Sequence, residues 1–412
     1  MLAPSFALLL WILSANFAQS LKASAWHLNR RRAILAKYPD LLDKVTADLK
    51  EGGDKRTLPS LIAVNSLQLA IALQVGAEHH QTFNTLQTCL LGATVGGTLS
   101  LWQFSLLHDI KHGGASLFPG ISPNLALFIG SQPSVFGYFL YLRFGHLSHH
   151  KDFGSKSLKD SFDSTAVNFE DGDVLFNAHR QMLAGDVKNE TIGFFGNEQV
   201  GGRGLSISRS FYSLFWREEA PMSNLLVYTV SMSYERAALC VNDIIVAITG
   251  TNFFFPSKPK VFLDTNARYS RMAALLHAML LLVAGPQALL YLFVSELAWQ
   301  LPVHPAFAMF VSNHPSYSTT TPDGRGLCQP TSSVYMHHPS IAVRSLFDLT
   351  CAFTNYHVEH HDFPEVPLWN LRQIREEASE FYDCLEGAED SWTAVVRKAF
   401  RGRQFYGCEG EL

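Results

Sequence analysis

Histidine is concentrated in three short segments of this chain. HDIKH spans residues 108–112, HLSHH spans 146–150 and HVEHH spans 357–361, and between them they hold eight of the 17 histidines. On a helix, residues three or four apart lie on one face, so each segment can aim two or three imidazoles at one point. Neutral imidazole binds iron, zinc, copper and nickel. The three segments together therefore predict a metal centre.

The number of imidazoles indicates which metal chemistry to expect. One HxxxH pair alone is often a surface or core feature, but here three clusters each follow an apolar stretch. Eight imidazoles exceed the four ligands of a tetrahedral zinc ion, so we expect two metal ions. Zinc has no redox chemistry, whereas iron can activate O2. An all-imidazole iron site beside apolar helices suits oxidation of an unactivated C–H bond in a lipid.

The composition indicates a membrane protein. Hydrophobic residues make up 47% of the 412 positions and charged residues only 17%, compared with about a quarter charged residues in a soluble domain. The net charge of −4 gives no indication of a nucleic-acid partner. The six cysteines include no CxxC pair, and we interpret them as reduced and structural.

Two apolar stretches precede the first histidine segment. Residues 58–77 and 85–107 contain no charged side chain and are long enough to cross a bilayer. The short polar segment between them predicts an antiparallel helical hairpin. Residues 268–301 predict a second hairpin, with Gly285-Pro286 near its middle.

Two other apolar stretches predict interfacial elements. Residues 225–248 carry Glu235, Arg236 and Asp243, and charges at the centre of a span are costly. Residues 121–142 are broken by Gly130 and Pro133. Residues 27–57 predict polar helix, and 151–221 and 315–333 predict loops. We expect an all-α, multi-pass membrane helical bundle of about four spans plus interfacial helices, with the histidines in a cytosolic di-iron cap.

Several segments carry a family resemblance. They are RRRAILAKYPDL, HDIKHG, HLSHHKDFG and YHVEHHDFPEVP, with FFPSKPK and LPVHPAFAMFVSNH upstream of the last. The chain resembles the sphingolipid Δ4-desaturase (dihydroceramide desaturase) family within the membrane fatty-acid desaturase superfamily, from about Trp26 to Phe400. This resemblance implies a desaturase domain over 26–400, a hydrophobic targeting or anchor segment over 1–25 and a C-terminal tail over 401–412.

The resemblance also implies a ligand set with one further histidine, His314. The nine expected metal ligands are His108, His112, His146, His149, His150, His314, His357, His360 and His361. Three carboxylates within or beside the segments, Asp109, Glu359 and Asp362, are candidates to orient imidazoles through hydrogen bonds; ordinary solvated carboxylates are the alternative. We expect His304 to be structural and His337-His338 to lie on the surface. The chain departs from the family at AMFVSNH, where the family has a GHFISEH-like segment, and in the longer loops 177–210 and 315–333.

The implied activity is O2-dependent desaturation of a long-chain base or acyl chain, at the 4,5 position of dihydroceramide. The alternatives are a desaturase or C4-hydroxylase acting on another lipid, such as a glycerolipid acyl chain, and a non-catalytic membrane protein that binds metal or lipid. The implied cofactors are two non-haem Fe ions, with O2 as co-substrate. Electrons would come from a separate cytochrome b5 and its reductase, since the sequence has no HPGG-type haem-binding segment. The implied location is the endoplasmic reticulum membrane; ASAW at 23–26 keeps a plastid membrane as the alternative.

Overall fold

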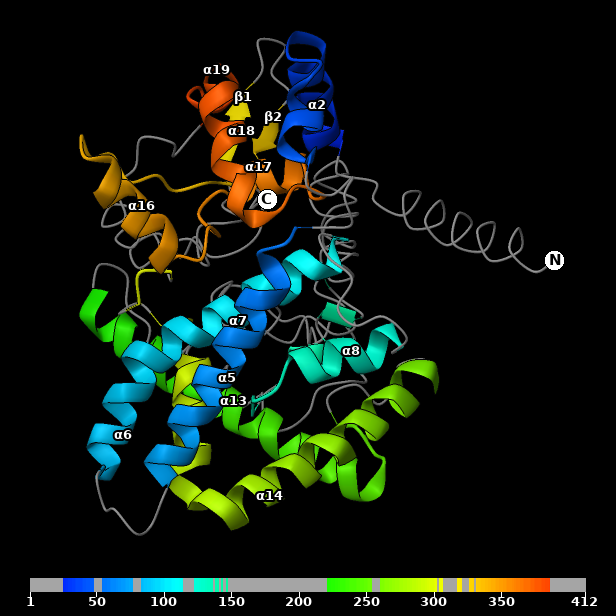
Figure 1. The fold of residues 1–412 in the computed structure, drawn as a ribbon, viewed down its shortest axis with the longest axis vertical. Helices are drawn as coiled ribbons and strands as arrows, with labels where there is room; N and C mark the ends of the chain where they lie inside the picture. The colour runs from blue at the N-terminus through cyan, green and yellow to red at the C-terminus, as the bar shows by residue number, and fades with distance from the viewer. Residues whose placement is uncertain are drawn as a thin grey trace, which may run out of the picture.

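The computed structural model has two parts, a bundle of long helices and a cap of short ones (Figure 1). It describes residues 25–47, 54–76, 83–113, 122–135, 138–140, 142–143, 146, 221–253, 260–301, 304–306, 317–320, 326–329 and 331–385. The sequence predictions for residues 1–24, the loop 177–210 and the tail 401–412 lie outside these residues.

The first hairpin of the bundle agrees with the prediction. Helix α5 (Thr57–Gly76) is followed by α6 (Thr85–Leu91), a π-helical turn η2 (Gly92–Gly96) and α7 (Gly97–Lys111). The Asn84 side chain accepts a hydrogen bond from the backbone N–H of Gln87, and the Gln87 side chain accepts one from the N–H of Asn84, both at 2.9 Å. This reciprocal capping satisfies two backbone donors where α6 begins.

Small residues let the hairpin approach the last long helix, α14 (Lys260–Ala298). A Cβ placed on Gly76 would lie 1.8 Å from the carbonyl oxygen of Ala284, and one on Gly96 would lie 2.0 Å from Oγ of Ser295. Such contacts are far below van der Waals distance, so only glycine permits this packing. A second buried cluster between α5 and α14 includes Ala72 and Tyr291.

The segment 268–301, predicted as a helical hairpin, consists of two helices that meet at a kink and together carry the label α14. Gly285 has φ 71° and ψ −179°, which interrupts α14, and Pro286 follows at once. Proline has no N–H to donate and its fixed φ suits the first turn of a helix. The chain therefore resumes a helix directly instead of reversing, and α14 changes direction at this point (Figure 1).

Three helices in the described part of the chain are long and apolar enough to cross a membrane, over Thr57–Gly76, Thr85–Lys111 and Lys260–Ala298. The total of about four spans remains a prediction. Helix α13 (Pro221–Thr249) packs along α14 and is not among the three. Arg236 of α13 is buried and donates to Oε1 of Gln300 at 2.7 Å, so its charge lies inside the bundle. The stretch around Gly130 forms a short helix, α8 (Pro123–Gly130), in place of a span.

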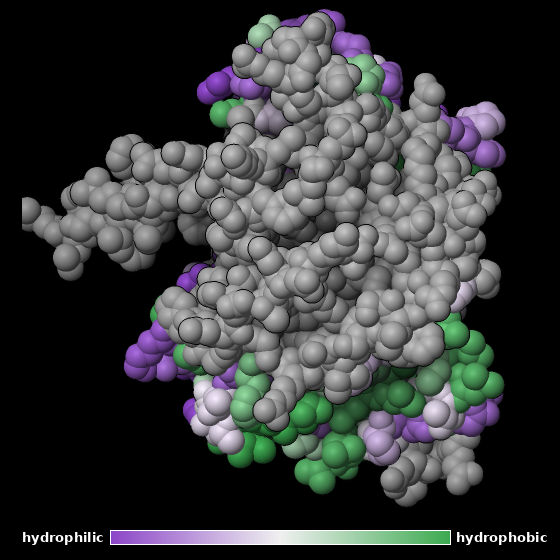
Figure 2. All heavy atoms as spheres, turned by 180° about the vertical axis from the view of Figure 1, so that it is seen from behind, coloured by the Kyte–Doolittle hydropathy of each residue, from purple (hydrophilic) through white to green (hydrophobic). Residues whose placement is uncertain are grey.

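The distribution of exposed apolar side chains matches the division of the molecule into a bundle and a cap. Large side chains such as Leu282, Val283 and Leu275 of α14 are exposed. Figure 2 shows apolar side chains gathered over the lower part of the molecule, where Figure 1 places the bundle, while hydrophilic ones lie around the cap. An apolar face of this extent would be unstable in water and indicates a membrane environment.

The cap joins the beginning of the described chain to its end. Its helices are α2 (Ala25–Lys37), α3 (Leu41–Val45), α16 (Ile341–Thr350), α17 (His357–Asp362), the 3-10 turn η5 (Leu368–Asn370), α18 (Leu371–Glu377) and α19 (Ser379–Tyr382). Both guanidinium nitrogens of Arg31 bind the Glu365 carboxylate, one of them at 2.8 Å. Lys37 and Lys44 pair with Glu380 and Glu377. The N-terminal helices are thus tied to the segment that follows the third histidine cluster.

One detail departs from the all-α prediction. Part of the stretch 315–333 forms an antiparallel hairpin of β1 (Tyr317–Thr320) and β2 (Gly326–Gln329), with Tyr317 opposite Gln329. The β-branched residues Thr319 and Thr320 favour a strand. This stretch was expected to be a loop throughout.

Candidate metal centre

Four histidines from three separate segments meet where the bundle joins the cap. They are His108, His112, His146 and His360, and their candidate ligand nitrogens all lie within 4.8 Å of one another. The Nε2 atoms of His112 and His146 are 2.6 Å apart. The ring of His108 lies 4.1 Å from that of His146 and 4.5 Å from that of His360, between centroids. At least one histidine from each of the three sequence clusters therefore belongs to this group.

Local helix geometry explains how each segment contributes. His108 and His112 are four positions apart at the end of α7, where His112 is the C-cap and Gly113 follows with φ 94°. One turn of helix places their imidazoles on the same face. His360 lies on α17, and Val358 of this helix and its C-cap residue Phe363 belong to the same core cluster as Leu106 and Leu107 of α7. Burial of this apolar core holds the two helices, and hence their histidines, together.

A second pair of imidazoles lies on α17. Nε2 of His361 is 3.1 Å from Nε2 of His357, one helical turn away. The rings of His360 and His361 are nearly perpendicular, at 81°. The third histidine cluster is thus divided, since His360 joins the four-histidine group and the other two face each other.

The four-histidine group fits a transition-metal ion. At metal–nitrogen distances of about 2.0–2.1 Å, ligands around one ion lie about 3–4 Å from one another. The four candidate nitrogens all lie within 4.8 Å of one another, with the His112 and His146 nitrogens 2.6 Å apart, so small ring rotations would bring them around one ion. His112, His146 and His360 are buried, and burial disfavours charged imidazole, whereas metal binding requires the neutral form. The donor set contains nitrogen alone, which is typical of sites for iron, zinc or copper and not for magnesium or calcium.

The remaining histidines divide into two groups. His149, His150 and His314 lie outside the described residues, so the structure describes the positions of the other six expected ligands. His304 is buried and its Nδ1 accepts a hydrogen bond from the N–H of Ala306 at 3.1 Å, which is the structural role expected for it. His337 and His338 are exposed, as expected.

Asp362 supports the centre through a histidine that the sequence analysis did not select. Oδ1 of Asp362 lies 2.7 Å from Nδ1 of His27 on α2, and its Oδ2 accepts from Nε of Arg30 at 3.2 Å. The His27 ring stacks on the ring of His361, with centroids 5.0 Å apart and an angle of 29°. Nε2 of His27 lies 3.0 Å from Oγ1 of Thr331. Both ring nitrogens of His27 therefore have protein partners, and the residue buttresses His361.

Burial and the neighbouring carboxylate have opposite effects on the pKa of His27. Burial is the larger influence and lowers the pKa of its imidazole, although the hydrogen bond and the charge of Asp362 raise it. An isolated histidine outside the three clusters gave no sequence signal for this role. Its position three residues before the arginine run of the family-like N-terminal segment was the available indication.

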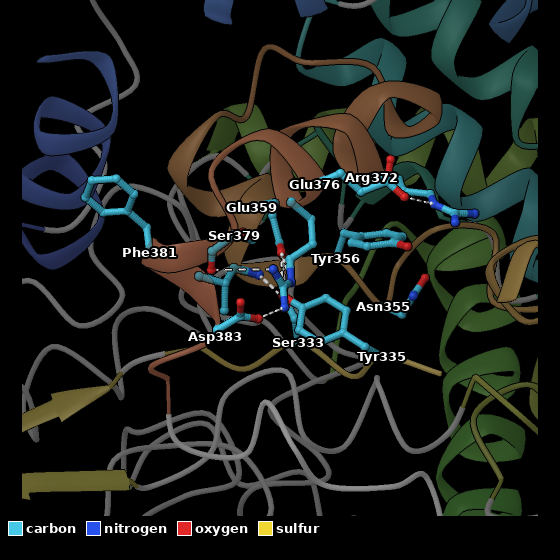
Figure 3. A network of polar contacts seen from close by, with 12 residues as sticks. Ser333, Tyr335, Asn355, Tyr356, Glu359, Arg372, Glu376, Ser379, Phe381 and Asp383 are labelled. Carbon is cyan, nitrogen blue, oxygen red and sulfur yellow. Dashed lines mark hydrogen bonds and ion pairs between the residues drawn. The ribbon is translucent and has the colours of Figure 1, made fainter. Parts of the chain in front are cut away.

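Glu359 lies in a polar network of the cap that includes Ser333 and Tyr335 (Figure 3). Its Oε2 accepts from Oγ of Ser333 at 2.7 Å and its Oε1 accepts from the Tyr335 hydroxyl. Nε of Arg375 lies 3.9 Å from the same carboxylate. Burial raises the pKa of Glu359 to about 7, and these hydrogen bonds oppose the shift. The carboxylate therefore joins α17 to the segment 331–335 and to α18, instead of orienting an imidazole as the sequence suggested.

Asp109 likewise serves as a structural link. Oδ2 accepts from Oγ1 of Thr57 at 3.1 Å, and Oδ1 accepts from the backbone N–H of Leu368 at 3.0 Å. These bonds connect α7 to the start of α5 and to η5. Asp109 thus fixes the end of α7 that carries His108 and His112, and its two oxygens serve these donors, not an imidazole.

A narrow cavity of about 60 Å³ adjoins the histidines. Most of its lining is apolar and includes Leu101, Phe104, Trp299 and Phe353. The imidazoles of His108, His146, His357 and His360 also line it, with Ser105, Asp109, Thr354 and Tyr356 as the other polar residues. Phe104 and Trp299 are stacked with centroids 5.3 Å apart. A cavity with apolar walls that ends at imidazoles can hold a hydrocarbon segment against a metal and exclude water from it.

Comparison with known proteins agrees with this geometry. Residues 203–387 match the family model of the fatty acid desaturases. A sphingolipid delta(4)-desaturase DES1-like protein of Oryza sativa subsp. japonica is 24% identical over 370 residues, which cover 90% of this chain and 84% of the relative. A sphingolipid delta(4)-desaturase/C4-monooxygenase DES2 of Bos taurus is 28% identical over 373 residues, which cover 90% and 86%.

A shorter match is more similar. The sphingolipid delta(4)-desaturase/C4-monooxygenase DES2 of Homo sapiens is 51% identical over 41 residues, which are 10% of this chain and 12% of that protein. No solved structure matches the chain significantly.

Proposed function

Because this chain belongs to the fatty acid desaturase family, we propose that it introduces a double bond between carbons 4 and 5 of dihydroceramide. The coarser conclusion, an oxidoreductase that desaturates a lipid, follows from the family and its relatives. The sphingolipid substrate is supported by the printed names of those relatives, all of which act on sphingolipids.

The observation that carries the proposal is the convergence of histidines at the end of an apolar cavity. His108, His146 and His360 come from segments up to 252 positions apart, yet their candidate ligand nitrogens lie within 4.8 Å of one another. The same imidazoles line the cavity beside Phe104 and Trp299. A reactive metal and a lipid chain would therefore meet at one place.

The two groups of histidines correspond to two metal positions. His108, His112, His146 and His360 would hold one iron, and His357 and His361 would contribute to the second, together with His149, His150 and His314. Iron held in this way supplies the oxidation of an unactivated C–H bond by O2. The chain's own contribution is to position two neighbouring methylenes against the imidazole end of the cavity and to keep water out through its aromatic wall.

Asp362 and His27 would keep the His361 ring in a fixed orientation, and Asp109 would hold the end of α7. Such supporting contacts commonly determine metal affinity and ligand orientation. We propose a separate cytochrome b5 with its reductase as the electron source, and the endoplasmic reticulum as the location, with the histidine cap in the cytosol. A plastid membrane is the alternative location.

C4-hydroxylation of the same lipid is the second candidate. The relatives in Bos taurus and Homo sapiens carry the description C4-monooxygenase as well as delta(4)-desaturase. Both outcomes begin with removal of hydrogen from one methylene, and they differ in whether a second hydrogen is lost or a hydroxyl is gained. A non-catalytic role in metal or lipid binding is the third reading.

The proposal is tested by expressing the full chain in a yeast that lacks sphingolipid Δ4 desaturation and analysing its lipids by mass spectrometry. We expect new 4,5-unsaturated long-chain bases. Accumulation of 4-hydroxylated bases would assign the hydroxylase, and altered glycerolipid acyl chains with unchanged sphingolipids would overturn the substrate. The His360→Ala variant, expressed to the same level, serves as the inactive control.

Metal analysis of the purified protein separates catalysis from simple binding. Two irons per chain agree with oxidation. One zinc, or no metal, together with unchanged lipids in the yeast would favour the non-catalytic reading.

A further inference from the structure

Helix α16 turns most of its large apolar side chains outward, and the residues that it buries are Phe347 and Asp348. Leu346 and Ile341 are 66% and 63% exposed, and Val343 and Leu349 are exposed on the same helix. Asp348 is 2% exposed. A helix on a water-soluble surface exposes its charged side chains and buries its apolar ones. The exposed apolar side chains and the buried carboxylate of α16 therefore require an explanation.

Polar contacts hold the helix in this orientation. Asp348 accepts hydrogen bonds from Nδ2 of Asn355 and from the Tyr356 hydroxyl, both at 2.9 Å. Nη1 of Arg372 on α18 lies 3.1 Å from Oγ of Ser345 and 3.4 Å from Asp348. Figure 3 shows Asn355, Tyr356 and Arg372 in the same region of the cap. Rotating α16 to bury its apolar side would leave Asp348 without these partners, at a large energetic cost.

The end of α16 is also attached to a membrane-spanning helix. Nε1 of Trp102, on the candidate span Thr85–Lys111, donates to the carbonyl oxygen of Leu349 at 3.0 Å. The Trp102 ring contacts the ring of Trp369, with centroids 5.1 Å apart. Tryptophan is enriched where a membrane meets water. Figure 1 shows α16 to one side of the α17–α19 cap, next to the bundle helix that carries Trp102.

We propose that the apolar face of α16, formed by Ile341, Val343, Leu346 and Leu349, is embedded in the interface of the bilayer that the bundle spans. A lipid surface fits better than a protein partner, because Trp102 joins this helix directly to a candidate membrane span. A helix of ten residues is about 15 Å long, and its four large apolar side chains would anchor it in the headgroup region.

This contact places the bilayer beside the candidate site. The turn after α16 contains Ala352 and Phe353 with φ 47° and 58°, a left-handed conformation that costs energy for residues other than glycine. Both residues line the cavity that His357 and His360 close. A lipid moving from the bilayer interface to the histidines would pass this turn. That consequence rests on the proposed function, whereas the bilayer contact itself does not.

The test is photo-crosslinking of the full-length protein in phosphatidylcholine nanodiscs. The photoreactive residue p-benzoylphenylalanine replaces Leu346 in one protein, Leu282 of α14 in a second and Lys37 of α2 in a third. Leu282 is 85% exposed on a candidate span, and the Lys37 side chain is 57% exposed on the cap. Mass spectrometry then measures the phosphatidylcholine adduct at each position.

We expect the adduct yield at position 346 to approach that at position 282 and to exceed that at position 37 by about tenfold. A yield at 346 no higher than at 37 would overturn the proposal, as would crosslinks from 346 to a second protein chain. The same probe at Ile341 repeats the measurement if the protein with the probe at 346 does not fold. No turnover is required, so the result is independent of whether the chain desaturates sphingolipids.

Discussion

Nδ1 of His27 lies 2.7 Å from Oδ1 of Asp362, although 335 positions separate the two residues in the chain. Asp362 directly follows the third histidine cluster, and His27 stacks on its last member, His361. The N-terminal helix α2 is therefore part of the support of the candidate metal centre. Removing this helix would leave the Asp362 carboxylate, which is fully buried, without its histidine partner.

Replacing Asp362 with Asn tests this support. The change removes the charge that holds His27 and Arg30, so the His361 ring loses its fixed neighbour. We expect metal affinity to fall by about 10- to 100-fold, measured as the chelator concentration that removes half of the iron. Glu365→Gln, which removes the partner of Arg31 on the same segment, is the matched control and should retain its iron. Equal iron retention in the Asp362 variant and the control would contradict the role of Asp362.

Replacing His360 with Ala tests the four-histidine group. His360 is the only member of that group supplied by α17, so its loss opens the site on one side. We expect the loss of a ligand to lower activity by more than the roughly 100-fold that supporting residues produce, and to reduce the bound iron. His338→Ala removes an exposed imidazole from the same cap and should leave both quantities unchanged. Retained turnover in the His360 variant would exclude it as a ligand.

Much of the bundle was predictable because it is determined by local composition. An uncharged stretch at 58–77 leaves no alternative to a long apolar helix, and the structure places α5 at Thr57–Gly76. The course of α14 was not predictable in the same way. Gly285-Pro286 is typical both of a turn and of a bend, and the packing of Ala284 against Gly76 favours the bend.

The candidate site also has features that local sequence determines and features that tertiary packing determines. Histidine spacing indicated which imidazoles share a helix face, such as His108 and His112 of α7, whereas the approach of His360 on α17 depends on how the two helices pack. The directions of the neighbouring carboxylates depend on tertiary partners. Glu359 accepts hydrogen bonds from Ser333 and Tyr335, and Asp109 accepts them from Thr57 and Leu368. No pattern near His27 indicated that it would meet Asp362.

Gly76→Ala is expected to separate α5 from α14. The new Cβ would lie 1.8 Å from a backbone oxygen of Ala284, which cannot move without the helix. Overpacking of this kind typically costs about 1–3 kcal/mol. Gly92→Ala is the matched control, because its Cβ meets its nearest neighbours at 3.1 Å, among them the side chain of Val294. Thermal unfolding in detergent should rank the Gly76 variant well below the Gly92 variant, and the reverse order would contradict this packing.

The contact between α2 and α19 should contribute to stability in a pH-dependent way. Hydrogen bonds from Lys37 and then from Tyr38 lower the pKa of Glu380 from its ordinary 4.5 to about 2. A carboxyl whose pKa is lower in the folded state stabilises the fold above its unfolded pKa, and this contribution disappears as the pH falls through the folded value. We therefore expect the wild-type protein to unfold at a higher temperature than Glu380→Gln at pH 6, and the difference to close between about pH 4.5 and pH 2. Because the pair is exposed, the difference should be small and should shrink in high salt.

Lys37→Met should reproduce the effect, and the double variant should add nothing further to it. A difference between wild type and Glu380→Gln that stays constant with pH would show that Lys37 does not stabilise the charged carboxylate.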